Sequence, residues 1–246
     1  MDKYGLIGFP LKHSFSKDFF NEKFRAENID ARYENFEIPA IKDFPAIIEE
    51  NPTLRGLNVT IPYKEEIIPF LDDIDKAAKA IGAVNVIKIT RPKGKTKLTG
   101  FNSDIIGFTR SIEPLLEPHH THALVLGTGG AAKAICHGLQ QLGITPMYVT
   151  RQAKDGMLTY GDLTPEIMER HKVIVNCTPV GMFPDTGHCP SIPYDCLTPS
   201  HLLYDLIYNP ERTTFLKEGA AHKAIVKNGL EMLLLQAIAS WEIWNK

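Results

Sequence analysis

A glycine-rich segment that joins an apolar run to a helix-forming run constrains the fold of this chain more than any other feature. Gly127, Gly129 and Ala132 match the pattern G-x-G-x-x-A, and the run at 122–127 predicts the strand before it. In such a turn the first glycine permits a tight bend, the second lets the backbone approach a pyrophosphate, and the alanine keeps the helix close to the sheet. The sequence therefore predicts a dinucleotide-binding α/β unit that begins near residue 122.

The end of the next predicted strand, at 146–150, indicates which dinucleotide is bound. Arg151 follows Thr150 where an NAD enzyme usually carries an acid for the ribose hydroxyls, and no acid occurs before Asp155. A guanidinium can bind a 2′-phosphate through two parallel hydrogen bonds, and Lys154 adds a second positive charge. The alternative is that Arg151 is an ordinary solvated surface residue. Together with the missing acid, it favours NADP over NAD.

Strand and helix patterns alternate along the rest of the chain, which predicts an α/β fold. The strands expected in the first half are 3–8, 33–38, 56–60, 84–89 and 97–102, the last two pairing as a hairpin across the turn at 91–94. The helices expected there are 16–28, 41–50, two stretches over 64–81, and one from residue 103 or 104 to 116. The second half predicts further strands at 173–177 and 202–206 and a final apolar helix from Asn228.

The restart of the strand pattern after a polar connection indicates two domains. Glu117, Pro118 and the histidines that follow interrupt the helical pattern, and the glycine-loop unit begins directly after them. We expect one domain over 1–103, a second over 119–227, and a helix over 228–246 that packs on another part of the chain.

Composition and charge limit the class of partner. The 246 residues are 43% hydrophobic and 23% charged, which suits packed cores, and the formal net charge of −2 gives no basic field for nucleic acid or an anionic membrane. We therefore expect a small-molecule substrate. Pro10, Lys12 and His13 interrupt the N-terminal apolar run, so we expect no signal peptide and a cytoplasmic location. The four cysteines have no metal-ligand spacing, and we expect reduced thiols and no metal.

Polar residues of the first half follow predicted strands, where open α/β sheets place their ligand crevice. Ser14 and Ser16 follow the first strand and could hold a carboxylate at a helix N-terminus. On spacing alone, an N-cap and a solvated serine explain them more simply.

A second polar group spans the segment from Asn58 to Lys64, and a third spans Asn85 and the segment ending at Asp104. Asn58, Thr60 and Lys64 suit a polyhydroxylated ligand, and Lys64 could donate a proton to a carbonyl oxygen. Taken singly, Lys64 is most simply a surface lysine, and Asp104 is most simply a helix cap. Reduction of a ketone needs a proton on oxygen, which a Lys/Asp pair can supply.

Together these segments resemble shikimate dehydrogenases, in order and spacing and over essentially the whole chain. The matching segments are 14–16, 58–64, 82–85, 102–104, 127–134, 176–182, 205–210 and 229–237. The resemblance implies NADPH-linked reduction of 3-dehydroshikimate to shikimate, on the route to aromatic amino acids, by a monomer or homodimer. It also implies an N-terminal substrate domain, a Rossmann-like NADP domain with the active site in the cleft, and a C-terminal helix that returns to the substrate domain.

The resemblance further implies roles for individual residues. Lys64 and Asp104 would form the catalytic pair. The substrate-binding residues would be Ser14, Ser16, Asn58, Thr60, Lys64, Asn85, Asp104, Tyr208 and Gln236. The cofactor-binding residues would be Gly127, Gly129, Gly130 and Ala131 at the pyrophosphate, Thr150 and Arg151 at the adenosine phosphate, and Met182, Ile207 and Gly229 near the nicotinamide.

One departure from the family pattern and two rival functions remain. The family usually reads Asn-Arg-Thr where this chain has Thr150, Arg151 and Gln152, which weakens the case for strict NADP selectivity. The rivals are a quinate/shikimate dehydrogenase that uses NAD and a non-catalytic NADP-binding regulator.

Three other features are expected to be structural. We expect the histidines at 119, 120 and 122 to lie in a solvated linker and Cys177 to pack behind the cofactor. We expect the stripe formed by Ile238, Trp241 and Trp244 to be core or a dimer contact.

Overall fold

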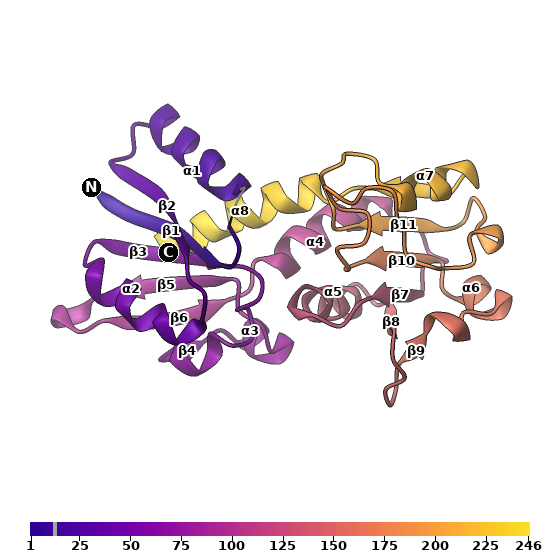
Figure 1. The fold of residues 1–246 in the computed structure, drawn as a ribbon, viewed down its shortest axis with the longest axis horizontal. Helices are drawn as coiled ribbons and strands as arrows, with labels where there is room; N and C mark the ends of the chain where they lie inside the picture. Colours follow the sequence, from indigo (N-terminus) through magenta and orange to yellow (C-terminus); the bar gives the residue numbers. More distant parts are fainter. Residues whose placement is uncertain (12–13) are drawn as a thin grey trace. The chain divides into compact units, whose positions relative to one another are not determined.

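The computed structural model describes residues 1–11 and 14–246, and Lys12 and His13, used above to argue against a signal peptide, lie outside the described residues. The chain divides into two compact units, Met1–Ser103 with Ala237–Lys246 and Asp104–Gln236. Each unit contains its own six-stranded sheet (Figure 1). The predicted α/β class is confirmed.

The first unit is built on a mixed sheet. In spatial order its strands are β2 (Ala31–Glu37), β1 (Asp2–Gly8), β3 (Leu54–Val59), β5 (Val86–Thr90), β6 (Lys97–Phe101) and β4 (Asp73–Ile74). Strand β5 is antiparallel to β3 and β6, whereas β1, β2 and β3 pair in parallel and β4 pairs in parallel with β6. The ends of β1, β3 and β6 and the start of β5 therefore lie at one edge of the sheet.

Two apolar layers cover this sheet. The helical segments are α1 (Phe15–Ala26), η1 (Ile41–Asp43), α2 (Phe44–Glu50), η2 (Ile68–Phe70), α3 (Lys76–Ile81) and η3 (Pro92–Gly94). Phe20 and Phe24 of α1 pack on Tyr4 and Tyr33 on one face, and Phe44 and Ile47 of α2 belong to the cluster on the other. The alternation of side chains along each strand sends successive residues into these two layers.

The C-terminal end of the chain packs into the apolar layer that contains Phe20 and Tyr33. The indole of Trp244, near the end of α8 (Leu230–Asn245), donates a hydrogen bond to the Ile87 carbonyl at 3.1 Å. Its ring packs on Gly56 of β3, where a Cβ would collide with the indole. The contact needs glycine at this position because any side chain would occupy the space of the ring.

The second unit is a doubly wound parallel sheet. In spatial order its strands are β12 (Ile225–Lys227), β11 (Leu202–Asp205), β10 (Val173–Asn176), β7 (His122–Leu126), β8 (Thr145–Thr150) and β9 (Leu158–Thr159). The order reverses between β7 and β10, and ligands of open α/β sheets bind beyond the strand ends at such a point.

Helices cover both faces of this second sheet. They are α4 (Asp104–Ile112), η4 (Glu113–Leu115), α5 (Gly130–Gln141), η5 (Tyr160–Asp162), α6 (Pro165–Arg170), η6 (Tyr194–Cys196), α7 (Thr214–Ala221) and the first part of α8. Phe108 of α4 and Ile135 of α5 belong to one apolar cluster, and Met168 of α6 and Phe215 of α7 belong to the other. Central strands such as β10 are buried along their whole length, as expected for a parallel sheet between two helical layers.

Several predicted elements differ from the structure. The first of the two helical stretches expected over 64–81 is wrong: turns and the short η2 occupy it, and Pro69, which lacks an amide donor, lies inside η2. Strands β4, β9 and β12 were not predicted because two or three residues are too short to show alternation. The final helix is shared, since residues up to Gln236 belong to the second unit and those from Ala237 to the first.

No helix in the described ranges 1–11 and 14–246 is both long enough and apolar enough to cross a membrane.

The Gly56 contact predicts a stability effect. Gly56→Ala should lower the free energy of unfolding by about 1–3 kcal/mol, because the new methyl displaces the Trp244 ring. Urea denaturation followed by tryptophan fluorescence measures the effect. The matched control is Gly187→Ala, where an added Cβ meets no atom within 4 Å. An equal loss in both variants would show that the packing against Trp244 is not the cause.

Candidate functional site

The turn after β3 carries Thr60 and Lys64 at the strand-end edge of the first sheet. The Thr60 amide donates to the Ile7 carbonyl at 2.9 Å, and the Tyr63 amide donates back to the Thr60 carbonyl at 2.9 Å. The Lys64 carbonyl accepts from the Val84 amide at 2.7 Å, which fastens the turn to the residues before β5. Lys64 is half-buried, so it lies at the edge of the core with its position set from both sides.

The first turn of α1 carries the two serines. Ser14 is the N-cap of α1, and its hydroxyl oxygen accepts from the Lys17 amide at 3.2 Å. Ser16 lies two residues further along, within the first turn of the helix, and its side chain opposes the rise that burial causes in the pKa of Tyr33. Ser14 therefore has the capping role that its spacing suggests, and both hydroxyls are half-buried at the helix start.

Asn58, on β3, is buried beneath this edge. Its Oδ1 accepts from the Tyr33 hydroxyl at 2.8 Å, and its Nδ2 donates to the Asn85 carbonyl at 3.3 Å and to Ser240 Oγ at 3.0 Å. Both amide hydrogens are thus used within the first unit. Ser240 comes from the C-terminal part of α8, so the helix supplies a polar group to the same layer.

The segments before β5 and after β6 are joined by buried amides. Asn85 Oδ1 accepts from the Ser103 amide at 2.6 Å, and Asn85 Nδ2 donates to Ser103 Oγ at 3.0 Å. Asn102 Nδ2 donates to the Ala83 carbonyl at 2.9 Å. These bonds satisfy polar groups that would otherwise be costly to bury, and they bring the two parts of the third predicted polar group together.

Asp104 is the first residue of α4 and is buried. It belongs to the second unit, whereas Lys64 belongs to the first. The pairing of Lys64 with Asp104 therefore stays a prediction.

The glycine loop of the second unit has the geometry of an anion-binding turn. Gly127 has a φ of 105°, a backbone conformation that residues other than glycine rarely adopt. A Cβ at Gly129 would meet no atom within 4 Å, so space is open above the N-cap of α5. In the described part of the chain no side chain caps α5, and the amides of Gly130 and Ala131 at its first turn are left for a ligand.

The strand next to the loop ends in the predicted phosphate-binding pair. Thr150 ends β8 and is half-buried, whereas Arg151 is exposed. The positive charge of Arg151 opposes the rise that burial causes in the pKa of Tyr160, the first residue of η5. An exposed guanidinium at this strand end is available to an anionic group.

A buried carboxylate joins the loops that follow β10 and β11. Asp205 Oδ1 accepts from Asn176 Nδ2 and from the Ile207 amide, each at 3.1 Å, and Asp205 Oδ2 accepts from the Thr213 hydroxyl at 2.6 Å. Asn176 Oδ1 in turn accepts from the Thr178 amide and hydroxyl. Burial raises the pKa of Asp205 to about 6, and the three donors act against that rise.

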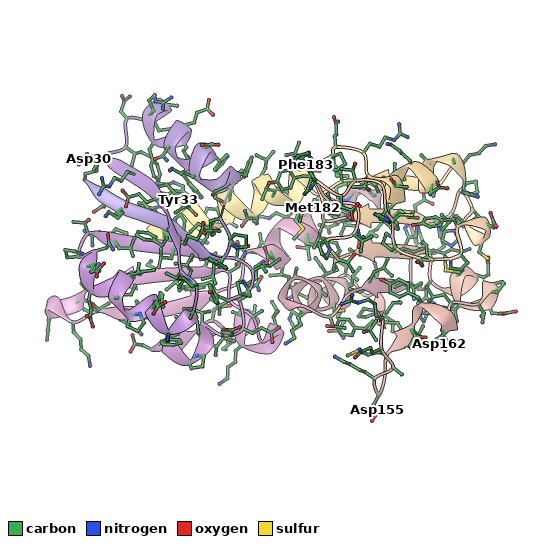
Figure 2. All side chains as sticks on the ribbon, viewed as in Figure 1. Asp30, Tyr33, Asp155, Asp162, Met182 and Phe183 are labelled. Atoms are coloured by element: carbon green, nitrogen blue, oxygen red, sulfur yellow. The ribbon has the colours of Figure 1, made fainter. Side chains whose placement is uncertain are left out.

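The predicted nicotinamide-side residues lie on these same loops. The Gly229 amide donates to the Ile207 carbonyl at 3.1 Å, and a Cβ at Gly229 would collide with the Leu206 backbone. Met182 and the adjacent Phe183 are exposed on the loop after β10 (Figure 2). Asp205 therefore holds the backbone of Ile207, which in turn holds Gly229.

Two further predicted substrate residues belong to the second unit. Gln236 of α8 is nearly buried, and its Nε2 donates to the Leu233 carbonyl at 3.0 Å. Gly107 of α4 faces Gln236, where a Cβ would lie 3.1 Å from the glutamine Cβ. Tyr208 is exposed after β11.

The histidine cluster corrects one expectation. His120 is buried and not solvated, because its ring and that of His119 both reach the Ser200 carbonyl, at 3.2 Å and 3.0 Å. Within the described residues no group of histidine, cysteine and acidic side chains could hold a metal.

The cysteines and the C-terminal stripe behave as structural residues. All four cysteines are free, and burial raises the pKa of the Cys177 thiol well above its usual range. A protonated thiol is a poor nucleophile. In the C-terminal stripe Trp244 is core, whereas Ile238 is exposed.

Sequence reasoning missed Tyr33, Ser240, Asp205 and Thr213. Asp205 lies in one of the matched segments and ends a buried strand, so its polarity at that position was a usable signal. Tyr33 and Ser240 carry no such signal, because each lies in an otherwise ordinary strand or helix.

The Asp205 carboxyl predicts a pH dependence of stability. Because the pKa of Asp205 is raised in the folded chain, the folded state binds this proton more tightly than the unfolded state does. The stabilisation that this proton gives to the folded state is therefore lost as the pH rises from about 4 to about 6. Asp205→Asn mimics the protonated form and should remove that loss. The difference in free energy of unfolding between wild type and variant should change by about 2–3 kcal/mol over this window.

Denaturation at a series of pH values measures this change. Asp155→Asn serves as the control, because the Asp155 side chain lies at the exposed end of its loop (Figure 2). A parallel pH course for wild type and Asp205→Asn would contradict the raised pKa.

Comparisons with known proteins agree with this arrangement. The family model described as the shikimate dehydrogenase substrate binding domain matches residues 6–87. A shikimate dehydrogenase (NADP(+)) of Desulforamulus reducens is 35% identical, over 98% of this chain and 89% of the relative.

Solved structures extend the match to the whole fold. The crystal structure of shikimate dehydrogenase from Aquifex aeolicus has a TM-score of 0.86 at 35% identity, covering 100% of this chain and 92% of that one. A shikimate dehydrogenase solved in complex with NADP+ has a TM-score of 0.86 at 30% identity, covering 99% and 90%. The chain belongs to the shikimate dehydrogenase family.

Proposed function

We propose that this chain reduces 3-dehydroshikimate reversibly to shikimate with NADPH, a step of aromatic amino acid biosynthesis. The observation that carries the proposal is the uncapped α5 N-terminus at the switch point of a Rossmann-ordered sheet, followed by Arg151 and no acid at the next strand end. Full-length relatives with the same named activity support the substrate.

The residues of the second unit fit an NADP cofactor. The backbone around Gly127, Gly129, Gly130 and Ala131 would hold the pyrophosphate, because its amides point out of an open helix N-terminus. The 2′-phosphate would bind to Thr150 and Arg151, and the nicotinamide would bind near Met182, Ile207 and Gly229. Bound NADPH supplies a hydride to the ketone carbon.

The residues of the first unit and α4 would bind and protonate the substrate. Ser14 and Ser16 would hold the carboxylate, and Tyr208 would lie near it. Thr60, Asn85, Asp104 and Gln236 would contact the hydroxyls. Lys64 would hold a proton at the ketone oxygen, and Asp104 would orient the lysine and relay the proton.

Other assignments stay predictions of the sequence. They are a cytoplasmic location, a monomeric or homodimeric state, the absence of a nucleic-acid partner, and the domain ranges 1–103, 119–227 and 228–246 with their functions. The second candidate function, a non-catalytic NADP-binding regulator, differs from the enzyme in a single observable, which is turnover.

The catalytic proposal predicts the effect of Lys64→Ala. Loss of the proton donor should lower kcat by about 10²–10⁴-fold and leave the KM for NADPH unchanged, since the cofactor residues are elsewhere. Absorbance at the NADPH band with 3-dehydroshikimate measures both. Near-normal kcat in the variant would remove Lys64 from the mechanism, and no turnover by the wild type with NADPH or NADH would favour the regulator.

The cofactor proposal predicts the effect of Arg151→Ala. Removing the guanidinium should raise the KM for NADPH by about 10–100-fold and change the KM for NADH little, because only NADPH carries the 2′-phosphate. The control is Arg170→Ala, which removes another exposed arginine of the same unit. A similar rise for both cofactors would show that Arg151 does not select between them.

A further inference from the structure

A connected set of buried hydrogen bonds crosses the first unit from β2 to α8. Tyr33 bonds to Asn58, and Asn58 bonds to Ser240. Ser240 Oγ lies 3.1 Å from Ser103 Oγ, which accepts from Asn85 Nδ2 at 3.0 Å. Asn85, one of the proposed substrate contacts, thus lies at one end of a polar network whose other end is Tyr33.

Tyr33 is the residue of this network with the most closely defined position. Asn21 of α1 holds both of its backbone groups, accepting from the Tyr33 amide at 2.9 Å and donating to the Tyr33 carbonyl at 3.0 Å. Its ring stacks on Phe20 at 4.9 Å, with 13° between the planes. These contacts fix the position of the ring and of its hydroxyl, and Tyr33 as a whole is 1% exposed.

The Tyr33 hydroxyl remains a donor at all relevant pH values. Burial raises its pKa well above the usual range, and the nearby Ser16 side chain opposes that rise only in part. A hydroxyl buried without partners is costly, so this one must use its hydrogen bonds. Phenylalanine would pack on Phe20 and Trp244 in the same way, so the ring contacts do not account for the hydroxyl at this position.

The Asn85 carbonyl determines which way the Asn58 amide faces, and the Tyr33 hydroxyl holds the amide in that orientation. With Oδ1 toward Tyr33, Nδ2 donates to the Asn85 carbonyl and to Ser240 Oγ. If the amide were reversed, its oxygen would face the Asn85 carbonyl, and two acceptors would be opposed. Tyr33 supplies a buried donor to Oδ1, and this bond helps to fix the amide and, through it, Ser240.

We propose that Tyr33 is a positioning residue for the substrate site, acting on Asn85 through Asn58 and Ser240. Asn58 then transmits orientation within the protein and does not donate to substrate, which revises the contact that the family resemblance implies for it. Ser240 gives the C-terminal part of α8 a role in the same network. The inference rests on the proposed function.

Tyr33→Phe tests the proposal, because it keeps the ring and removes the hydroxyl alone. We expect the KM for 3-dehydroshikimate to rise by about tenfold, since Asn58 Oδ1 loses its buried donor and the amide that contacts Asn85 and Ser240 is held less firmly. The KM for NADPH should stay within about twofold, because the glycine loop belongs to the other unit. The matched control is Tyr4→Phe, which removes a hydroxyl from a buried tyrosine that also packs on Trp244.

Ser240→Ala and the double variant test the connection through Asn58. If both residues act through this amide, the combined rise in the KM for 3-dehydroshikimate should be clearly smaller than the product of the two single rises. Independent, multiplicative effects would overturn the relay through Asn58. Thermal unfolding of every variant identifies losses that come from folding, and Ser240→Ala alone carries the test if Tyr33→Phe is unfolded.

The outcomes separate this inference from the function on which it rests. No turnover by the wild type would refute the function. Wild-type turnover with an unchanged KM for 3-dehydroshikimate in Tyr33→Phe, or an equal rise in Tyr4→Phe, would refute the positioning role while leaving the function intact.

Discussion

In both units, the parallel backbone pairing of neighbouring strands is the constraint on which the candidate sites depend. β1 pairs with β3, and β7 pairs with β10, so residues that follow each strand emerge at the same edge. Lys64 and the serines follow one such edge, and the glycine loop follows the other. A one-residue shift of register would turn these side chains to the opposite face of the sheet.

Buried polar groups then define the loops more finely than backbone pairing can. Asn58 in the first unit and Asp205 in the second each take part in three side-chain hydrogen bonds. The Asn58 partners are distant in the sequence, whereas two of the Asp205 partners, Ile207 and Thr213, follow it closely. The two residues differ in one physical respect: the amide is neutral, whereas the carboxylate opposes its own burial. Orientation in the first unit is therefore independent of pH, and the loops of the second unit are linked to a proton.

Much of the fold and of the candidate cofactor site could be predicted because the signals are local. The glycine pattern between a strand and a helix, and an arginine in place of an acid, each need only a few adjacent residues. The stretch after Lys64 could not be predicted in the same way, because Pro69 and the tight turn at Thr60 outweigh its helix-forming residues. The buried state of His120 also required the Ser200 carbonyl, which lies 80 residues away.

The sequence by itself determined the α/β class, the glycine loop, the NADP-type strand end and the family resemblance, because these depend on spacing along the chain. Only the tertiary structure decided that Tyr33, Asn58 and Ser240 form one network and that Asp205 holds Ile207. Such contacts depend on which side chains meet after the strands pair and α8 packs on the first sheet. Tyr33 and Ser240 are 207 positions apart in the printed numbering, and nothing in the pattern around either residue indicates the other.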